Sequence, residues 1–128
     1  MARFIIDTSA YSRFVAGDGA VKKWFSATNE LLIPLVTIAE LKAGFVNGSR
    51  TAENMDALNR FLVAPNVEVL SANYETTDMY ADIFVELRQA GKALSMNDIW
   101  IAALCRQNDL PLLTADNDFK HVSGLELL

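Results

Sequence analysis

The chain has 128 residues, of which 52% are hydrophobic, and it carries a formal net charge of −5. This length suits one domain with its own core, and the composition excludes a disordered chain. No apolar stretch approaches the roughly 20 residues of a membrane-spanning helix. The N-terminal "MARFIID" reaches Asp7 after only three apolar residues, so it is not a signal peptide. We therefore expect a single domain over residues 1–128 with no membrane segment.

The few cysteine and histidine residues narrow the chemistry further. One cysteine, Cys105, cannot form an internal disulfide, and it suits a small core residue of a cytoplasmic protein. One histidine, His121, cannot build a histidine metal cage or a histidine pair for acid–base catalysis. The negative charge at first disfavours nucleic acid, which binds Lys and Arg. If five acids share one site, however, the remaining charges balance, so the net charge alone excludes no partner.

The first half of the chain alternates apolar runs, typical of buried strands, with the apolar spacing of helices. Asp7 closes the first strand, Pro34 marks the end or an irregular edge of the second, and Gly48 stops the helix that follows. The predicted elements are strands at 3–6 and 31–36, two short helices between them (the second around 20–27), and a helix at 37–48.

The same alternation continues in the second half, where one helix ends before Pro65 and a longer one ends at Gly91. Helices are predicted at 51–64, 74–89 and 96–108, and strands at 67–70, 110–114 and, as a last candidate, 125–128. The side chains expected to face the core are Trp24, Phe25, Met55, Leu58, Phe61, Leu62, Met79, Ile83, Phe84, Leu87 and Trp100. Strands that alternate with helices predict an α/β fold with three layers, α/β/α, around a mostly parallel sheet.

Several acids lie where a strand ends or a helix begins, and each has a purely structural explanation. Asp7 suits a helix N-cap, and Glu40 could close a capping box opened by Thr37. Asp98 would lie in the first turn of a helix, where the helix dipole favours an acid. The aspartate pair in "LLTADNDF" suits a turn at the end of a strand.

Taken together, the acids predict one site. In a parallel α/β sheet the carboxyl ends of the strands and the starts of the following helices lie on the same side, where ligands bind. Carboxylates gathered there repel one another unless a cation intervenes. A cluster of oxygen ligands without histidine or thiolate suits Mg²⁺ or Mn²⁺ rather than zinc or copper. The acids expected to share this site are Asp7, Glu40, Asp98, Asp116 and Asp118.

Four blocks of the sequence, "FIIDTSAY", "TIAELKAG", "SMNDIWIAA" and "LLTADNDF", resemble the signature motifs of the PIN-domain family in order and spacing. With "HVSGLELL" closing the chain, the whole is similar to the VapC-type toxins of bacterial toxin–antitoxin pairs. By position, Asp7, Glu40, Asp98 and Asp116 match the acidic quartet of the family, which implies that these four bind the metal and catalyse. The resemblance gives supporting roles at the site to Thr8, Ser9, Thr114 and Asp118.

The resemblance also implies a function: an endoribonuclease that depends on Mg²⁺ or Mn²⁺, cuts cellular RNA and is inhibited by a cognate antitoxin. It further implies that the chain forms a homodimer. The chemistry agrees, because metal-bound water can attack phosphorus while the metal offsets charge on the phosphoryl oxygens. One carboxylate can orient or deprotonate that water. Candidate contacts to RNA phosphates are Arg13, Arg88 and Lys92.

Two other functions stay open at this point. Another metal-dependent phosphohydrolase of the α/β class would also place acids at strand ends. A haloacid-dehalogenase-like enzyme would need a second acid at position 9, where the chain has Ser9, and a receiver-like domain would need a lysine after a late strand, where "LLT" offers none. The other alternative is an inactive PIN-like module that binds RNA or a partner without cutting it, and only activity would distinguish it.

Overall fold

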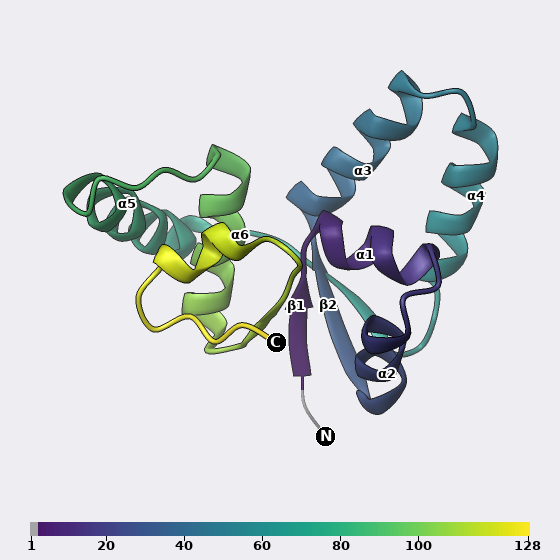
Figure 1. Cartoon of the computed structure of the whole chain (residues 1–128), viewed down its shortest axis with the longest axis horizontal. Helices are drawn as coiled ribbons and strands as arrows, with labels where there is room; N and C mark the ends of the chain where they lie inside the picture. Colours follow the sequence, from purple (N-terminus) through teal and green to yellow (C-terminus); the bar gives the residue numbers. More distant parts are fainter. Residues whose placement is uncertain (1–2) are drawn as a thin grey trace.

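The computed structural model describes residues 3–128, in which parallel strands form one sheet between two groups of helices (Figure 1). The strands are β1 (Arg3–Ile6), β2 (Glu30–Pro34), β3 (Val67–Leu70) and β4 (Leu112–Leu113). Their order across the sheet is β3-β2-β1-β4, and all neighbouring strands pair in parallel. This arrangement confirms the predicted three-layer α/β/α fold.

The helices divide between the two faces of the sheet, with α5 and α6 on one side and α1 to α4 on the other (Figure 1). Asp7, Asp18, Asn73 and Ser95 cap the starts of α1, α2, α5 and α6, because the side-chain oxygen of each accepts a bond from a backbone N–H of the first turn. The helices are α1 (Thr8–Val15), α2 (Gly19–Ala27), α3 (Leu35–Asn47), α4 (Thr51–Leu62), α5 (Tyr74–Gln89), α6 (Met96–Asn108) and the short 3-10 helix η1 (Asn117–His121).

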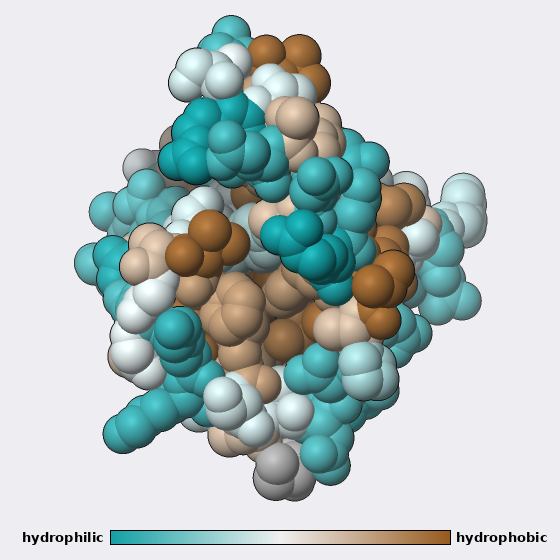
Figure 2. All heavy atoms as spheres, turned by 90° about the vertical axis from the view of Figure 1, so that its right-hand side faces the viewer, coloured by the Kyte–Doolittle hydropathy of each residue, from teal (hydrophilic) through white to brown (hydrophobic). Residues whose placement is uncertain are grey.

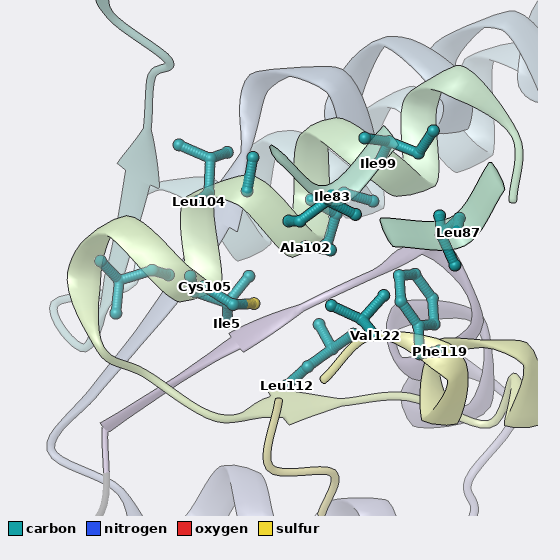
Figure 3. Packing of buried hydrophobic residues seen from close by; sticks show 13 residues of the cluster. Ile5, Ile83, Leu87, Ile99, Ala102, Leu104, Cys105, Leu112, Phe119 and Val122 are labelled. Atoms are coloured by element: carbon teal, nitrogen blue, oxygen red, sulfur yellow. The ribbon is translucent and has the colours of Figure 1, made fainter. Parts of the chain in front are cut away.

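Alternate residues of each strand face opposite layers, so the sheet separates two hydrophobic clusters. The cluster beneath α5 and α6 includes Cys105, as predicted, and the fully buried ring of Phe119 from η1 (Figure 3). The strand residues on that side are Ile5, Leu32 and Leu112. Those on the side of α1 to α4 are Phe4, Ile6, Leu31, Ile33 and Leu113.

Several predicted boundaries were wrong, and the strand predicted at 110–114 spans only Leu112–Leu113. Pro34 is the last residue of β2, opposite Leu70, and its φ of −64° turns the chain directly into α3, which begins at Leu35 rather than at 37. α4 ends at Leu62 because Pro65 disfavours helical geometry in the residue before it. The predicted final strand is a single bridge between Leu112 and Leu127.

One predicted core residue faces solvent instead. Ile83 and Leu87 form the buried stripe of α5, whereas the side chain of Phe84 is 44% exposed. Phe84 lies about 100° around the helix from Ile83, which takes it out of that stripe. Trp24 and Trp100, also predicted to face inward, are half-buried, and Trp100 packs against Tyr80 with ring centroids 4.6 Å apart.

The face that carries α1 and α4 is hollowed, with apolar atoms on its floor and hydrophilic residues around it (Figure 2). Two cavities lie among these helices. One, of about 160 Å³, is lined by residues that include Tyr11, Val15 and Phe45, and the other, of about 190 Å³, includes Phe14 and Phe61. Within residues 3–128, no helix has the length and hydropathy needed to cross a membrane.

The assignment of the buried face of α5 is testable. Replacing Ile83 with Ala should lower the free energy of unfolding by about 2–5 kcal/mol, because the fully buried side chain would leave a cavity. Val85→Ala on the same helix is the matched control, since Val85 is 50% exposed and the change should stay within about 0.5 kcal/mol. Urea unfolding followed by circular dichroism measures both, and equal losses would contradict this assignment.

Candidate functional site

Strand pairing places Asp7 and Thr114 next to each other. β1 and β4 are neighbours, with Ile6 opposite Leu113, so the residue that follows each strand lies at the same end of the sheet. The Thr114 hydroxyl donates a short hydrogen bond to Oδ2 of Asp7. Oδ1 of Asp7 accepts from the Ser9 hydroxyl at 2.7 Å and from the Ala10 N–H at 3.0 Å. Asp7 is only 4% exposed, so these donors hold its carboxylate in a fixed orientation.

Hydrogen bonds from backbone N–H groups to the same hydroxyls shape the loop after β4. The Ala115 N–H donates to Oγ of Ser9 at 2.9 Å, and the Asp116 N–H donates to Oγ1 of Thr114 at 3.0 Å. The Asp118 N–H then donates to Oδ1 of Asp116 at 2.9 Å, which makes Asp116 the cap of η1. The turn proposed for this stretch is therefore present, and it holds Asp116 toward the end of the sheet.

Glu40 lies in the second turn of α3, and the capping-box explanation for it is wrong. Because α3 begins at Leu35, Thr37 is inside the helix, and its buried hydroxyl lies 3.5 Å from the Ile6 carbonyl oxygen. Oε1 of Glu40 is buried, and no residue among 3–128 donates a hydrogen bond to it. A buried carboxylate oxygen without a donor is costly, which indicates that something outside the chain satisfies it.

Asp98 is the third residue of α6, and its N–H donates to the Ser95 hydroxyl at 3.2 Å. Burial raises the pKa of Asp98 to about 6, against a lowering by the Ser95 hydroxyl. The negative charges of Glu40, Asp116 and Asp7 each raise this pKa as well. The structure therefore brings all four predicted acids within electrostatic reach of one another.

The supporting residues divide between those that join this cluster and those that do not. Ser9 and Thr114 belong to it, because their hydroxyls lie 3.3 Å apart and both bind Asp7. Thr8 begins α1 and is half-buried, but among the described residues its side chain takes no part in this network. Asp118 is exposed, and its charge is not among those that act on Asp98.

A cation fits the charge and the donors of this cluster. The donors are carboxylate oxygens, as Mg²⁺ and Mn²⁺ prefer, and a cation would offset the repulsion at Asp98 and the orphaned oxygen of Glu40. Within the described part of the chain, however, no three of the His, Cys, Asp and Glu residues are arranged as a metal-binding group.

Two cavities contain the cations predicted to contact RNA phosphates. Arg13 lines one of about 220 Å³ beside Thr114 and pairs with Asp18 at 3.6 Å. Arg88 and Lys92 line the other, of about 200 Å³, together with Phe84. Phe84 was not predicted to line this cavity. It lies four residues before Arg88 on α5, and this spacing, which places both residues on one side of the helix, could have indicated that they line the same cavity.

The comparisons with known proteins agree with this geometry. The family model of the PIN domain matches residues 4–125. The chain is 28% identical over 126 residues to ribonuclease VapC5 of Mycobacterium tuberculosis, covering 94% of this chain and 87% of that protein. A crystal structure of VapBC2 from Rickettsia felis, bound to a DNA fragment from their promoter, has a TM-score of 0.89 and 21% identity, covering 98% of this chain and 97% of that one. VapBC-5 from Mycobacterium tuberculosis has a TM-score of 0.79 and 27% identity, with 100% and 98% covered. Since the family model spans nearly the whole sequence, the chain belongs to the PIN-domain family.

Proposed function

We propose that this chain, as a single PIN domain over residues 1–128, is an endoribonuclease that depends on Mg²⁺ or Mn²⁺. The observation that carries the proposal is the electrostatic coupling of Asp98 to Glu40, Asp116 and Asp7 at one end of the sheet. The name of the relative VapC5, a ribonuclease, supports the same chemistry. An acid with a raised pKa among neighbouring carboxylates is typical of catalytic sites.

The contacts of the four acids give them different proposed roles in metal binding and proton transfer. Asp7, Asp98 and Asp116 would hold the ion, and the hydroxyls of Ser9 and Thr114 would keep the carboxylate of Asp7 oriented. When bound, the ion supplies a more acidic water and offsets charge on the phosphate. Oε1 of Glu40, which has no donor within residues 3–128, is the atom best suited to bind the ion or accept a proton.

Relatives of known structure are VapBC complexes, so we propose that a cognate antitoxin inhibits this chain. From the resemblance to VapC-type toxins we further propose that the chain forms a homodimer and acts in the cytoplasm. Another α/β phosphohydrolase is less well supported, because the residue after Thr8 is a hydroxyl that binds Asp7 and Ala115 rather than a second acid. A PIN-like module that binds RNA without cutting it would keep the cluster but lack activity.

Metal dependence is tested by removing the ion. The purified protein should degrade RNA in Mg²⁺ or Mn²⁺, and EDTA should lower the rate by at least about a hundredfold, a typical contribution of positioned acid–base groups. Asp98→Asn, with the ion present, should show a similar loss. Cleavage of a labelled RNA on denaturing gels measures each rate, and activity that survives EDTA would contradict the metal mechanism.

The two aspartates after β4 should differ in their effect on cleavage. Asp116→Asn should reduce the rate by about a hundredfold or more, because Asp116 acts on Asp98 and is proposed to bind the ion. Asn is as good a cap as Asp, so η1 should persist. Asp118→Asn is the matched control and should lose less than about tenfold. Comparing cleavage rates of the two variants decides, and the reverse order would show that Asp118 is the ligand.

Thermal melts separate a structural role of Glu40 from metal binding. In EDTA, Glu40→Ala should leave the free energy of unfolding unchanged or raise it, because it removes a buried charge from mutual repulsion. With Mn²⁺ at a hundredfold excess over Kd, the wild type should gain about 2.7 kcal/mol and the variant much less. A variant that melts lower in EDTA yet gains as much from Mn²⁺ as the wild type would make Glu40 a structural residue.

A further inference from the structure

A cavity of about 200 Å³ lies between the end of α5 and the start of α6. We infer that this cavity binds one nucleotide of the RNA substrate, with the base against Phe84 and the phosphate on Arg88 and Lys92. The inference rests on the proposed function and names the contacts that hold its substrate. Its support comes from the charge, the lining and the position of the cavity.

The charge of this cavity distinguishes it from the others. Arg88 and Lys92 line it without an acid, and within residues 3–128 neither forms an ion pair. In the cavity beside Thr114, by contrast, Arg13 is balanced by Asp18 at 3.6 Å. The two cavities on the face of Figure 2 have no charged lining residue. An anionic ligand is therefore favoured between α5 and α6.

The lining also suits the flat, apolar faces of a base. Leu87 and Ile99, both buried, form its floor and pack into the cluster that contains Phe119 (Figure 3). Phe84 stands at its wall and keeps 44% of its surface exposed, which leaves an aromatic face free for stacking. An aromatic ring next to cations is a common way to bind a single-stranded nucleotide without reading its sequence.

The position of the cavity joins it to the proposed active site. Leu94 and Ile99, two of its lining residues, stand on either side of Asp98 in the chain. Phe119, which belongs to the same buried cluster as Leu87 and Ile99, lies in η1, the helix capped by Asp116. A nucleotide in the cavity would therefore contact Ile99, the residue that follows Asp98 in the chain.

RNA binding without cleavage tests the two cations. A short fluorescein-labelled single-stranded RNA of mixed sequence is titrated in EDTA, and its Kd is measured by anisotropy at several salt concentrations. The double variant Arg88→Ala, Lys92→Ala should weaken binding and reduce the slope of log K against log salt by about 1.4, since each phosphate contact to a single strand contributes about 0.7. The control Lys22→Ala, Lys23→Ala changes the net charge equally at two exposed lysines of α2 and should leave the slope nearly unchanged.

The aromatic contact has its own test. Phe84→Leu should raise the Kd by about tenfold, because it keeps apolar bulk but removes the ring. Phe84→Tyr keeps the ring and should bind as the wild type does. In the Mn²⁺ cleavage assay, both cavity changes should raise KM more than they lower kcat, as expected for contacts made in substrate and transition state alike.

The outcomes separate this inference from the proposed function. If the wild type binds and cleaves RNA and the Arg88, Lys92 and Phe84 variants bind as well as the lysine control, the cavity is not a nucleotide site, although the proposed function stands. If the wild type binds RNA with the expected differences but cuts none in Mn²⁺, the cavity inference stands and the nuclease proposal fails. If the wild type binds no RNA at low salt, the cavity inference is overturned.

Discussion

The negative charges of Asp7, Glu40 and Asp116 act on Asp98 at the end of the sheet, and much of the local structure holds these acids there. Burial and the neighbouring acids keep a proton on Asp98 more tightly than water would, with its pKa at about 6. The folded chain without an ion thus concentrates unfavourable charge, and a cation is the ligand that relieves it most directly. Charge, more than shape, determines what this part of the molecule can bind.

Backbone pairing supplies the rigidity that such a cluster requires. Because β1 lies against β4, the Asp7 carboxylate reaches the Thr114 hydroxyl, and the same hydroxyl accepts from the Asp116 N–H. The buried ring of Phe119 fixes η1 against α5 and α6. The site is therefore held by a parallel ladder on one side and by core packing on the other, and its acids need no long flexible loop to meet.

The sequence predicted most of the architecture because its periodicities are strong. The bounds of α5, α6, β1 and β3 are those expected. The clustering of the four acids could be predicted because strand ends and helix starts lie on one side of a parallel sheet. The start of α3 was not predicted, since an apolar run through Pro34 suits a strand and a helix equally well.

Other features depended on three-dimensional contacts that periodicity does not report. Phe84 and Ile83 are adjacent apolar residues on one helix, and only the packing of α5 against α6 decides that Ile83 is buried and Phe84 is exposed. Likewise, "TIAE" matches a capping box by spacing, yet α3 starts before Thr37, so Glu40 is left with a buried oxygen and no donor among the described residues. A motif predicts a residue's partners only when the helix start is known.

The C-terminal bridge has a consequence for how the sheet meets other molecules. β4 is an edge strand, but the Leu112 N–H donates to the Glu126 carbonyl oxygen and the Leu128 N–H donates to the Leu112 carbonyl oxygen. The last residues therefore occupy the backbone groups that an edge strand would otherwise offer to a foreign strand. At the opposite edge, β3 exposes Glu68, a charge that discourages edge-to-edge pairing with a strand of another molecule. Both borders of this short parallel sheet are thus protected against self-association through strand addition.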